Sequence, residues 1–227
     1  MAAEVQALCD AVTVVISPVM RIAYDGVLPE MSGEEVLIFT SRHGVEGFCR
    51  LSARRDFTCY AVGDATAEAA EAQGMRAISA GGDAEALLAR IAAEGVHGPF
   101  VHLRGAHVAA DIAGALRAAG HLARDAVVYD QVEAALSAGA QALLQGAQPV
   151  ILPLMSPRSA RIFLAQAEGV SAPLLIAAIS RNAADTLPED VAACVRIAEM
   201  PDLPGVLAVV QDLVQMAKRL EGGKRPQ

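Results

Sequence analysis

The sequence has 227 residues, 54% of them hydrophobic, and a mean hydropathy of +0.38, which excludes a largely disordered protein. A chain of this length can bury one large core or two small ones. Its net charge of -8, without a stripe of clustered Lys and Arg, argues against a general nucleic-acid or anionic-membrane surface.

Short apolar runs alternate with amphipathic, Ala-rich segments along nearly the whole chain. This alternation predicts parallel sheets with right-handed crossovers, and hence a doubly wound α/β fold. The expected strands are 12–16, 36–39, 58–62, 76–79, 100–103, 126–129, 150–152, 174–179 and 194–198. The expected helices are 3–9, 45–51, 65–72, 84–93, 109–119, 134–144, 159–167, 183–187 and 205–220.

One local pattern occurs twice. An apolar run breaks into a helix start in LIFTSRHGVEGF at 37–48, and again in VILPLMSPRSARIF at 150–163. After each break comes a second strand, then a second polar break and a second helix. The second break is at Gly63 in the first copy and at Ser180 in the second. Two such matches in the same order indicate an internally duplicated α/β unit.

Two segments, 18–31 and 129–133, do not fit the alternation, and we interpret them as crossings between domains. They predict two similar domains, one inserted in the other and joined by two connecting strands. The expected parts are an outer domain of 1–20 plus 133–227, an inserted domain of 32–128, and connections at 21–31 and 129–132. The first copy of the repeat lacks a leading strand, so the outer domain has one strand fewer or the chain begins late.

Polar residues follow the predicted strands at five breaks. In open α/β sheets, ligands bind beyond the carboxyl ends of the strands, where helix N-termini present free N–H groups. These breaks would form two facing rims of polar groups. Such rims would suit a ligand with several carboxylates or phosphates, held in the cleft between the domains. Ordinary helix N-caps explain the same residue types. The candidate binding residues are Ser41, Arg42, Gly63, Asp64, Thr66, Arg104, Ser156, Arg158, Ser180 and Asn182.

Motifs for metal or nucleotide cofactors are absent from the sequence, which has no H-E-x-x-H, G-x-S-x-G, P-loop or G-x-G-x-x-G after a strand. We therefore expect no cofactor. Tyr129 closes a strand at a predicted crossing, where its phenol would donate a proton or simply pack. Among the histidines, His43 lies near a rim. The other four are expected in solvent or turns: His97, His102, His107 and His121.

The remaining features favour a cytoplasmic protein. Apolar runs fall short of the roughly 18 residues that span a bilayer, and the N-terminus lacks the pattern of a signal peptide. The scattered cysteines indicate buried thiols in a reducing compartment: Cys9, Cys49, Cys59 and Cys194. The last basic cluster stands beside glycines and predicts a solvated end: Lys218, Arg219, Lys224 and Arg225.

Taken in order, these segments resemble the uroporphyrinogen-III synthase family. The resemblance rests on VMRI, LIFTSRHGVEGF, YAVGDATAEAAEAQG, LRG with its following helix, VVYD and SPRSARIFL, which span nearly the whole chain. It implies two α/β domains with the substrate in their cleft, no metal or organic cofactor, and a monomer. The implied reaction closes linear hydroxymethylbilane, which carries many carboxylates, through loss of water, a spiro intermediate and inversion of the last ring.

The resemblance also assigns individual residues. Ser41 corresponds to the serine of the family's T-S turn, Thr66 to the threonine after its Gly turn, and Ser156 to the serine of the second copy. Arg104 falls in the R-G turn, and Tyr129 corresponds to the tyrosine at the domain crossing, which is expected to assist departure of the hydroxyl group. Ser180 and Asn182 stand where relatives tend to have Gly and Thr.

Two alternatives remain open from the sequence alone. The chain could be a non-catalytic, two-lobed binding protein for an anionic metabolite or tetrapyrrole. It could also be a sugar- or nucleotide-binding α/β protein with an accidental repeat, although the lack of a Gly-rich phosphate loop argues against this.

Overall fold

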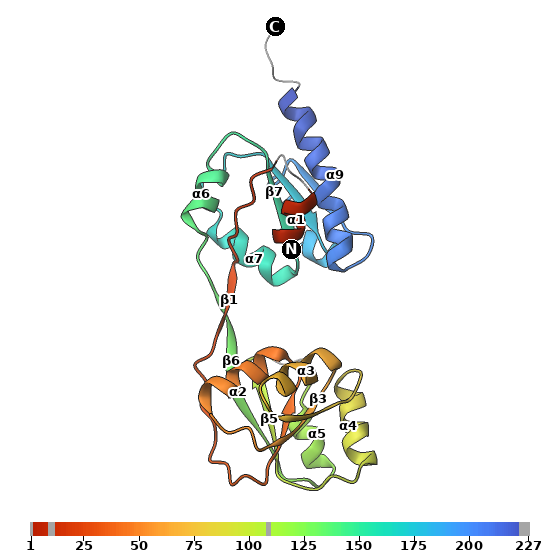
Figure 1. Cartoon of the computed structure of the whole chain (residues 1–227). Coiled ribbons are helices and arrows are strands. Elements are labelled where there is room, and N and C mark those ends of the chain that lie inside the picture. Colours follow the sequence, from red (N-terminus) through yellow and green to blue (C-terminus); the bar gives the residue numbers. More distant parts are fainter. Residues whose placement is uncertain (1, 9–11, 108–109, 223–227) are drawn as a thin grey trace. The chain divides into compact units, whose positions relative to one another are not determined.

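The structure, a computed structural model, describes residues 2–8, 12–107 and 110–222. It divides the chain into two compact units (Figure 1). The inner unit comprises residues 21–132, and the outer unit comprises residues 1–20 and 133–227. Both contain parallel strands that alternate with helices, so the predicted α/β fold class is confirmed.

The inner unit is built on a six-stranded sheet of order β1-β6-β5-β2-β3-β4, in which β2 to β6 pair in parallel. Apolar runs of β-branched and aromatic residues form the central strands, as expected for a sheet covered on both faces. The strands are β1 (Met20–Ala23), β2 (Val36–Phe39), β3 (Thr58–Ala61), β4 (Arg76–Ser79), β5 (Phe100–Gly105) and β6 (Ala123–Glu133). The helices are α2 (Arg42–Leu51), α3 (Asp64–Ala72), α4 (Ala84–Ala93) and α5 (Ile112–Ala118).

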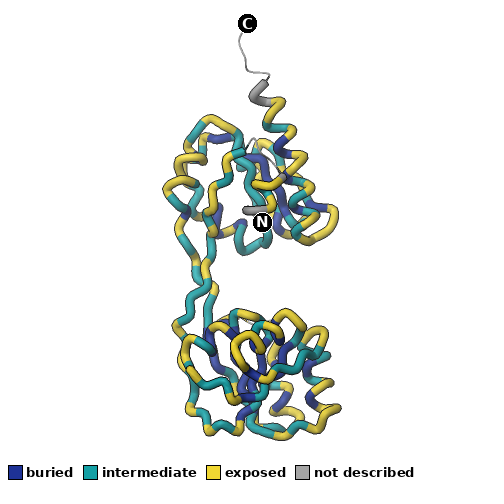
Figure 2. The backbone as a smooth tube through the Cα atoms, viewed as in Figure 1, coloured by how far each residue is buried: buried dark blue, intermediate teal, exposed yellow. Residues whose placement is uncertain are grey.

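Two hydrophobic cores cover the two faces of this sheet. Alternate residues of β2 point to opposite faces, so Phe39 packs with Phe48 of α2 while Ile38 packs with Leu87 of α4. The buried parts of the tube in Figure 2 follow these strands and the helix faces against them. Helices on both faces of a parallel sheet make the inner unit doubly wound.

The outer unit contains a three-stranded parallel sheet of order β7-β8-β9. The central strand β8 is buried along its whole length. Helix α9 packs its apolar stripe on one face, and α7 packs on the other. The strands are β7 (Val150–Leu154), β8 (Leu174–Ala178) and β9 (Cys194–Ile197). The helices are α1 (Ala2–Leu8), α6 (Ala138–Leu144), α7 (Pro157–Gln166), α8 (Arg181–Ala184) and α9 (Leu203–Gly222).

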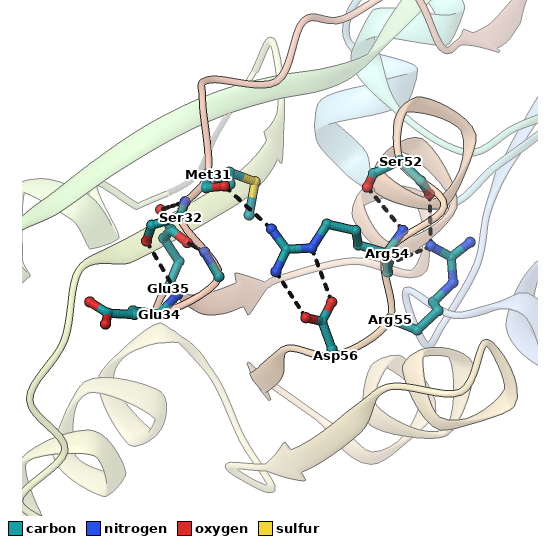
Figure 3. A network of polar contacts seen from close by, with 9 residues as sticks. Met31, Ser32, Glu34, Glu35, Ser52, Arg54, Arg55 and Asp56 are labelled. Atoms are coloured by element: carbon teal, nitrogen blue, oxygen red, sulfur yellow. Dashed lines mark hydrogen bonds and ion pairs between the residues drawn. The ribbon is translucent and has the colours of Figure 1, made fainter.

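A polar network ties together the segments that precede β2 and β3 (Figure 3). The Arg54 guanidinium donates to both carboxylate oxygens of Asp56, at 3.1 and 2.9 Å, and to the Met31 carbonyl at 3.3 Å. Its Cζ also lies 4.4 Å from the centre of the Phe57 ring. Because these contacts join the amino ends of the strands, they fix the edge of the sheet opposite the predicted rim.

The strand predicted at residues 12–16 and the surroundings predicted for His102 differ from the structure. Residues 12–16 do not form a strand: Val12 packs against the α9 core, whereas Ile16 is 71% exposed. An apolar run alone does not supply the neighbouring strand that a β-ladder requires. Met20–Ala23 forms β1, and β6 continues through residues 129–132, so strand residues lie in both segments where connecting strands are expected. The expectation of a solvated or turn histidine is wrong for His102, which is 1% exposed inside β5.

The cysteines that the structure describes are free thiols. Cys59 is buried, and burial raises the pKa of its thiol to about 12. Cys49 and Cys194 are half-buried. Cys9, Lys224 and Arg225 lie outside the described residues.

Candidate functional site

The predicted rim of the inner unit lies at the carboxyl edge of its sheet. Ser41 is the N-cap of α2, directly after β2, and its hydroxyl accepts a hydrogen bond of 3.1 Å from the His43 N–H. Gly63, after the neighbouring strand β3, is the N-cap of α3. Two helix N-termini therefore begin at adjacent strands, and helix N-termini are common binding sites for anions.

Tyr129 lies at the same edge, on β6 opposite Gly105 of β5. Its ring covers the glycine so closely that a Cβ on Gly105 would come within 2.7 Å of the tyrosine Cζ. The ring of His43 lies on Tyr129 as well, with ring centres 5.6 Å apart and planes inclined by 53°. Within the described residues, the half-buried Tyr129 hydroxyl makes no hydrogen bond, so it is available to a ligand.

Two glycines of α2 explain how His43 comes close to β6. A Cβ on Gly44 would lie 2.6 Å from the Leu103 carbonyl, and a Cβ on Gly47 would lie 2.5 Å from the Val128 carbonyl. Only glycine permits this approach of helix to sheet. The first turn of α2, which carries His43, is thereby held against β5 and β6.

Side chains from outside the predicted rim hold His43 in place. The Tyr24 hydroxyl lies 3.0 Å from His43 Nδ1 and donates to Glu46 Oε2 at 2.5 Å. Arg50, one helical turn further along α2, donates to Glu46 Oε1 at 2.7 and 3.2 Å. Sequence reasoning missed this cluster because Tyr24 stands in the irregular stretch before β2. The i, i+4 spacing of Glu46 and Arg50 was its only sequence signal.

The other candidates of the inner unit have varied surroundings. Arg42 is exposed, and Asp64 is exposed and accepts from the Ser79 hydroxyl at 2.6 Å. Thr66 is 7% exposed in the first turn of α3. Arg104 folds back to donate to Asp125 at 3.0 Å and to the Gly105 carbonyl at 2.9 Å. The structure thus brings Ser41 and Tyr129 to one edge of the sheet. Thr66 is instead buried, and the Arg104 guanidinium is hydrogen-bonded inside the inner unit.

A buried histidine stands behind this edge. His102 Nδ1 lies 3.1 Å from Asp125, and its Nε2 lies 3.4 Å from the Thr40 hydroxyl. Burial lowers the pKa of His102, and the Asp125 carboxylate opposes this effect. His102 therefore joins the end of β2 to β6. Its position inside the apolar run FVHLRG was the signal for burial.

The rim of the outer unit repeats the local geometry. Ser156 and Ser180 follow the adjacent strands β7 and β8 and are the N-caps of α7 and α8. The Ser156 hydroxyl accepts from the Ser159 N–H at 3.0 Å, and the Ser159 hydroxyl closes a reciprocal capping box. Asn182 is exposed and Arg158 is half-buried. Both serines thus serve as helix caps at a carboxyl edge.

No group of three or more His, Cys, Asp or Glu side chains in residues 2–8, 12–107 and 110–222 gathers in a way that would hold a metal ion. Over the same residues, none of the helices combines the length and apolar character needed to cross a membrane.

Comparisons with known proteins converge on one family. A family model described as uroporphyrinogen-III synthase HemD matches residues 4–208. Uroporphyrinogen-III synthetase from Helicobacter pylori 26695 is similar in structure, with 20% identity over 86% of this chain and 91% of that chain and a TM-score of 0.61. Wild-type uroporphyrinogen III synthase from Thermus thermophilus has 16% identity over 94% of this chain and 82% of that chain, with a TM-score of 0.39. A comparison with curated protein sequences found no match.

Proposed function

The chain belongs to the uroporphyrinogen-III synthase family, whose reaction forms uroporphyrinogen III in tetrapyrrole biosynthesis, and we propose that it performs this reaction as a cofactor-independent hydro-lyase. The substrate is hydroxymethylbilane, and the products are uroporphyrinogen III, with its last ring inverted, and water. The residue assignment rests on the position of Tyr129. Its hydroxyl has no hydrogen-bond partner among the described residues, and it lies at the edge of the sheet where the helix α2 begins.

Tyr129 serves as the acid of the first step. The C–O bond of the hydroxymethyl group breaks, its electron pair stays on oxygen, and the phenol proton converts the departing group to water. The pyrrole nitrogen stabilises the resulting azafulvene cation. Attack on this cation by the substituted carbon of the last ring gives a spiro intermediate, which fragments and recloses with that ring inverted. General acid catalysis of this kind contributes roughly 100-fold or more.

The rim residues hold the carboxylates of the bilane. In the inner unit, the first backbone N–H groups of α2 and α3, at Arg42, Asp64 and Ala65, and the exposed Arg42 guanidinium supply donors for acetate and propionate groups. In the outer unit, the exposed Asn182 amide, in the first turn after the N-cap Ser180, supplies a donor. Such donors act locally, since charges elsewhere on the surface are screened beyond roughly 8–10 Å. Holding the chain folded favours attack at the substituted carbon over direct closure to the type-I isomer.

The remaining assignments follow from the family and the composition. We expect a monomer in the cytoplasm that acts on a small polycarboxylate and binds neither nucleic acid nor membrane. The net charge of -8 supports the exclusion of polyanionic partners. Sedimentation of the purified protein would check the monomeric state.

One experiment tests the proposed activity. The protein is incubated with freshly generated hydroxymethylbilane, and the products are oxidised and resolved as type-I and type-III isomers. We expect the type-III isomer, at a rate proportional to protein concentration, and only the type-I isomer with heat-inactivated protein. Type-I product alone from the native protein would refute the enzymatic function. Tight binding of the bilane in that case would support the alternative of a binding protein.

A further inference from the structure

A chain of four side chains ends at His43. Arg50 donates to Glu46, Glu46 accepts from the Tyr24 hydroxyl at 2.5 Å, and the same hydroxyl oxygen lies 3.0 Å from His43 Nδ1. The Arg50 guanidinium also lies over the Tyr24 ring, 4.3 Å from its centre. Three of these residues share one face of α2, at 43, 46 and 50, and Tyr24 reaches them from the segment after β1.

The hydrogen-bond directions in this chain follow from the chemistry of its members. The hydrogen bonds from Tyr24 and Arg50 lower the pKa of Glu46, so this carboxylate only accepts. Burial, together with the Glu46 carboxylate, raises the pKa of Tyr24 to about 12, so Tyr24 keeps its single proton and donates it to Glu46. The Tyr24 oxygen then accepts from His43, which requires the proton of the neutral imidazole to be on Nδ1.

The other nitrogen of His43 is consequently the free base. Its Nε2 makes no hydrogen bond in the part of the chain that the structure describes. No buried side-chain nitrogen or oxygen of those residues lacks a partner, so Nε2 is open to solvent. A base whose far nitrogen is fixed by a third group is the arrangement that activates histidines in proton transfer.

This base lies at the rim of the inner unit. His43 follows the N-cap Ser41 by two residues, and its ring lies on the ring of Tyr129, with centres 5.6 Å apart. The groups that face the imidazole are Tyr24 from the segment after β1, Glu46 from its own helix and Tyr129 from β6. A histidine that served only to fill space beside Tyr129 would not need the Tyr24–Glu46–Arg50 chain.

We propose that His43 is a second proton-transfer residue of this site and that Tyr24 is the positioning residue that fixes its tautomer; both assignments rest on the proposed function. The reaction requires one proton for the departing hydroxyl and releases one from a pyrrole carbon. When the macrocycle closes, a C–C bond forms at the free α-carbon of the last ring. The C–H bond there breaks, its electrons restore the pyrrole, and His43 Nε2 takes the proton.

The protons then balance over one turnover. Tyr129 has given its proton to the leaving hydroxyl and is a phenolate, while His43 has become an imidazolium beside it. His43 then releases this proton to solvent and Tyr129 takes one up from solvent, which restores both groups and leaves water as the only by-product. Tyr129 thus donates and His43 accepts.

Replacement of His43 tests the proton transfer directly. In His43→Ala, we expect kcat for the type-III isomer to fall by about 100-fold, with KM changed by less than about threefold. Added imidazole should restore part of kcat, because it supplies the missing base without rebuilding the side chain. The matched control is His97→Ala, which removes an exposed histidine from the inner unit and should keep wild-type kcat.

The pH profile gives a second readout. Acceptance of a proton by His43 makes kcat depend on pH through this residue. The pH profile of the residual kcat should therefore change shape in His43→Gln. Loss of packing alone would lower kcat equally at every pH and would not respond to imidazole.

The tautomer is measured without substrate. Nitrogen NMR of ¹⁵N-labelled protein should show the His43 proton on Nδ1 in the wild type and a mixture of tautomers in Tyr24→Phe. A wild type with the proton on Nε2 would overturn the proposal. So would wild-type kcat in His43→Ala, even if the protein makes the type-III isomer. If native protein makes only the type-I isomer, the proposed function itself fails, and the NMR result separates that failure from an error in the His43 geometry.

Discussion

The ring of Tyr129 lies on the backbone of Gly105, with a hypothetical Cβ on the glycine only 3.0 Å from the phenol oxygen and 2.7 Å from Cζ. We predict that Gly105→Ala displaces the phenol, because the methyl group and the ring cannot occupy the same space. The variant should lose most of its type-III activity. Its inner unit should lose about 1–3 kcal/mol in free energy of unfolding, as for other overpacked sites.

The measurement combines initial rates with urea unfolding. The matched control is Gly139→Ala in α6, where a Cβ meets only Val15, at 3.5 Å. That helical position should accept alanine with unchanged activity and a gain of up to about 1 kcal/mol. Equal activities of the two variants would show that the contact between Gly105 and Tyr129 has no role in the reaction.

Tyr129→Phe removes the proposed acid and keeps the packing. Since the hydroxyl has no hydrogen-bond partner in the described chain, the free energy of unfolding should change by less than about 0.5 kcal/mol. The rate of type-III formation should fall by about 100-fold with little change in KM. Wild-type rates would contradict the acid role and leave Tyr129 as a positioning residue.

Tyr60→Phe is the matched control for that substitution. Tyr60 is 2% exposed on β3 and donates to Glu94 at 2.5 Å, in a position unrelated to the rim. Its loss should lower stability by about 1 kcal/mol and leave the isomer ratio unchanged. The two variants together separate an effect on chemistry from an effect on folding.

The rims were predictable from the sequence because they depend on local rules. Ser41 and Ser156 both end an apolar run and begin a helix, and both are N-caps in the structure. The contacts of Tyr24 with His43 and of His102 with Asp125 join residues about 20 positions apart in sequence, and only the sheet topology brings them together. The strand predicted at residues 12–16 is wrong for the same reason, because pairing depends on a partner elsewhere in the chain.

Two substitutions of Ser156 distinguish a helix-capping role from a substrate-binding role. A serine that only caps α7 can be replaced by glycine at a cost of a few tenths of a kcal/mol, whereas alanine costs about 1 kcal/mol. A hydroxyl that also binds a carboxylate of the bilane is lost equally in both variants. We therefore predict that Ser156→Gly and Ser156→Ala raise KM by a similar factor while only the alanine variant unfolds earlier in urea. An unchanged KM in the glycine variant would mean that Ser156 is a cap alone.

His102 predicts a specific pH dependence of folding. Burial lowers its pKa below the ordinary value of about 6.5, so below pH 6.5 the unfolded chain binds a proton that the folded inner unit does not. The stability of the inner unit should therefore be fully present above about pH 6.5 and should decrease as the pH falls toward the lowered pKa. In His102→Gln this component is absent, and the free energy of unfolding should depend less on pH, by up to about 1.4 kcal/mol per pH unit.

Tyrosine fluorescence reports this unfolding selectively, because the chain has no Trp and its three tyrosines, at 24, 60 and 129, all belong to the inner unit. Identical slopes in the two proteins would show that His102 takes up its proton as readily in the folded state as in the unfolded one.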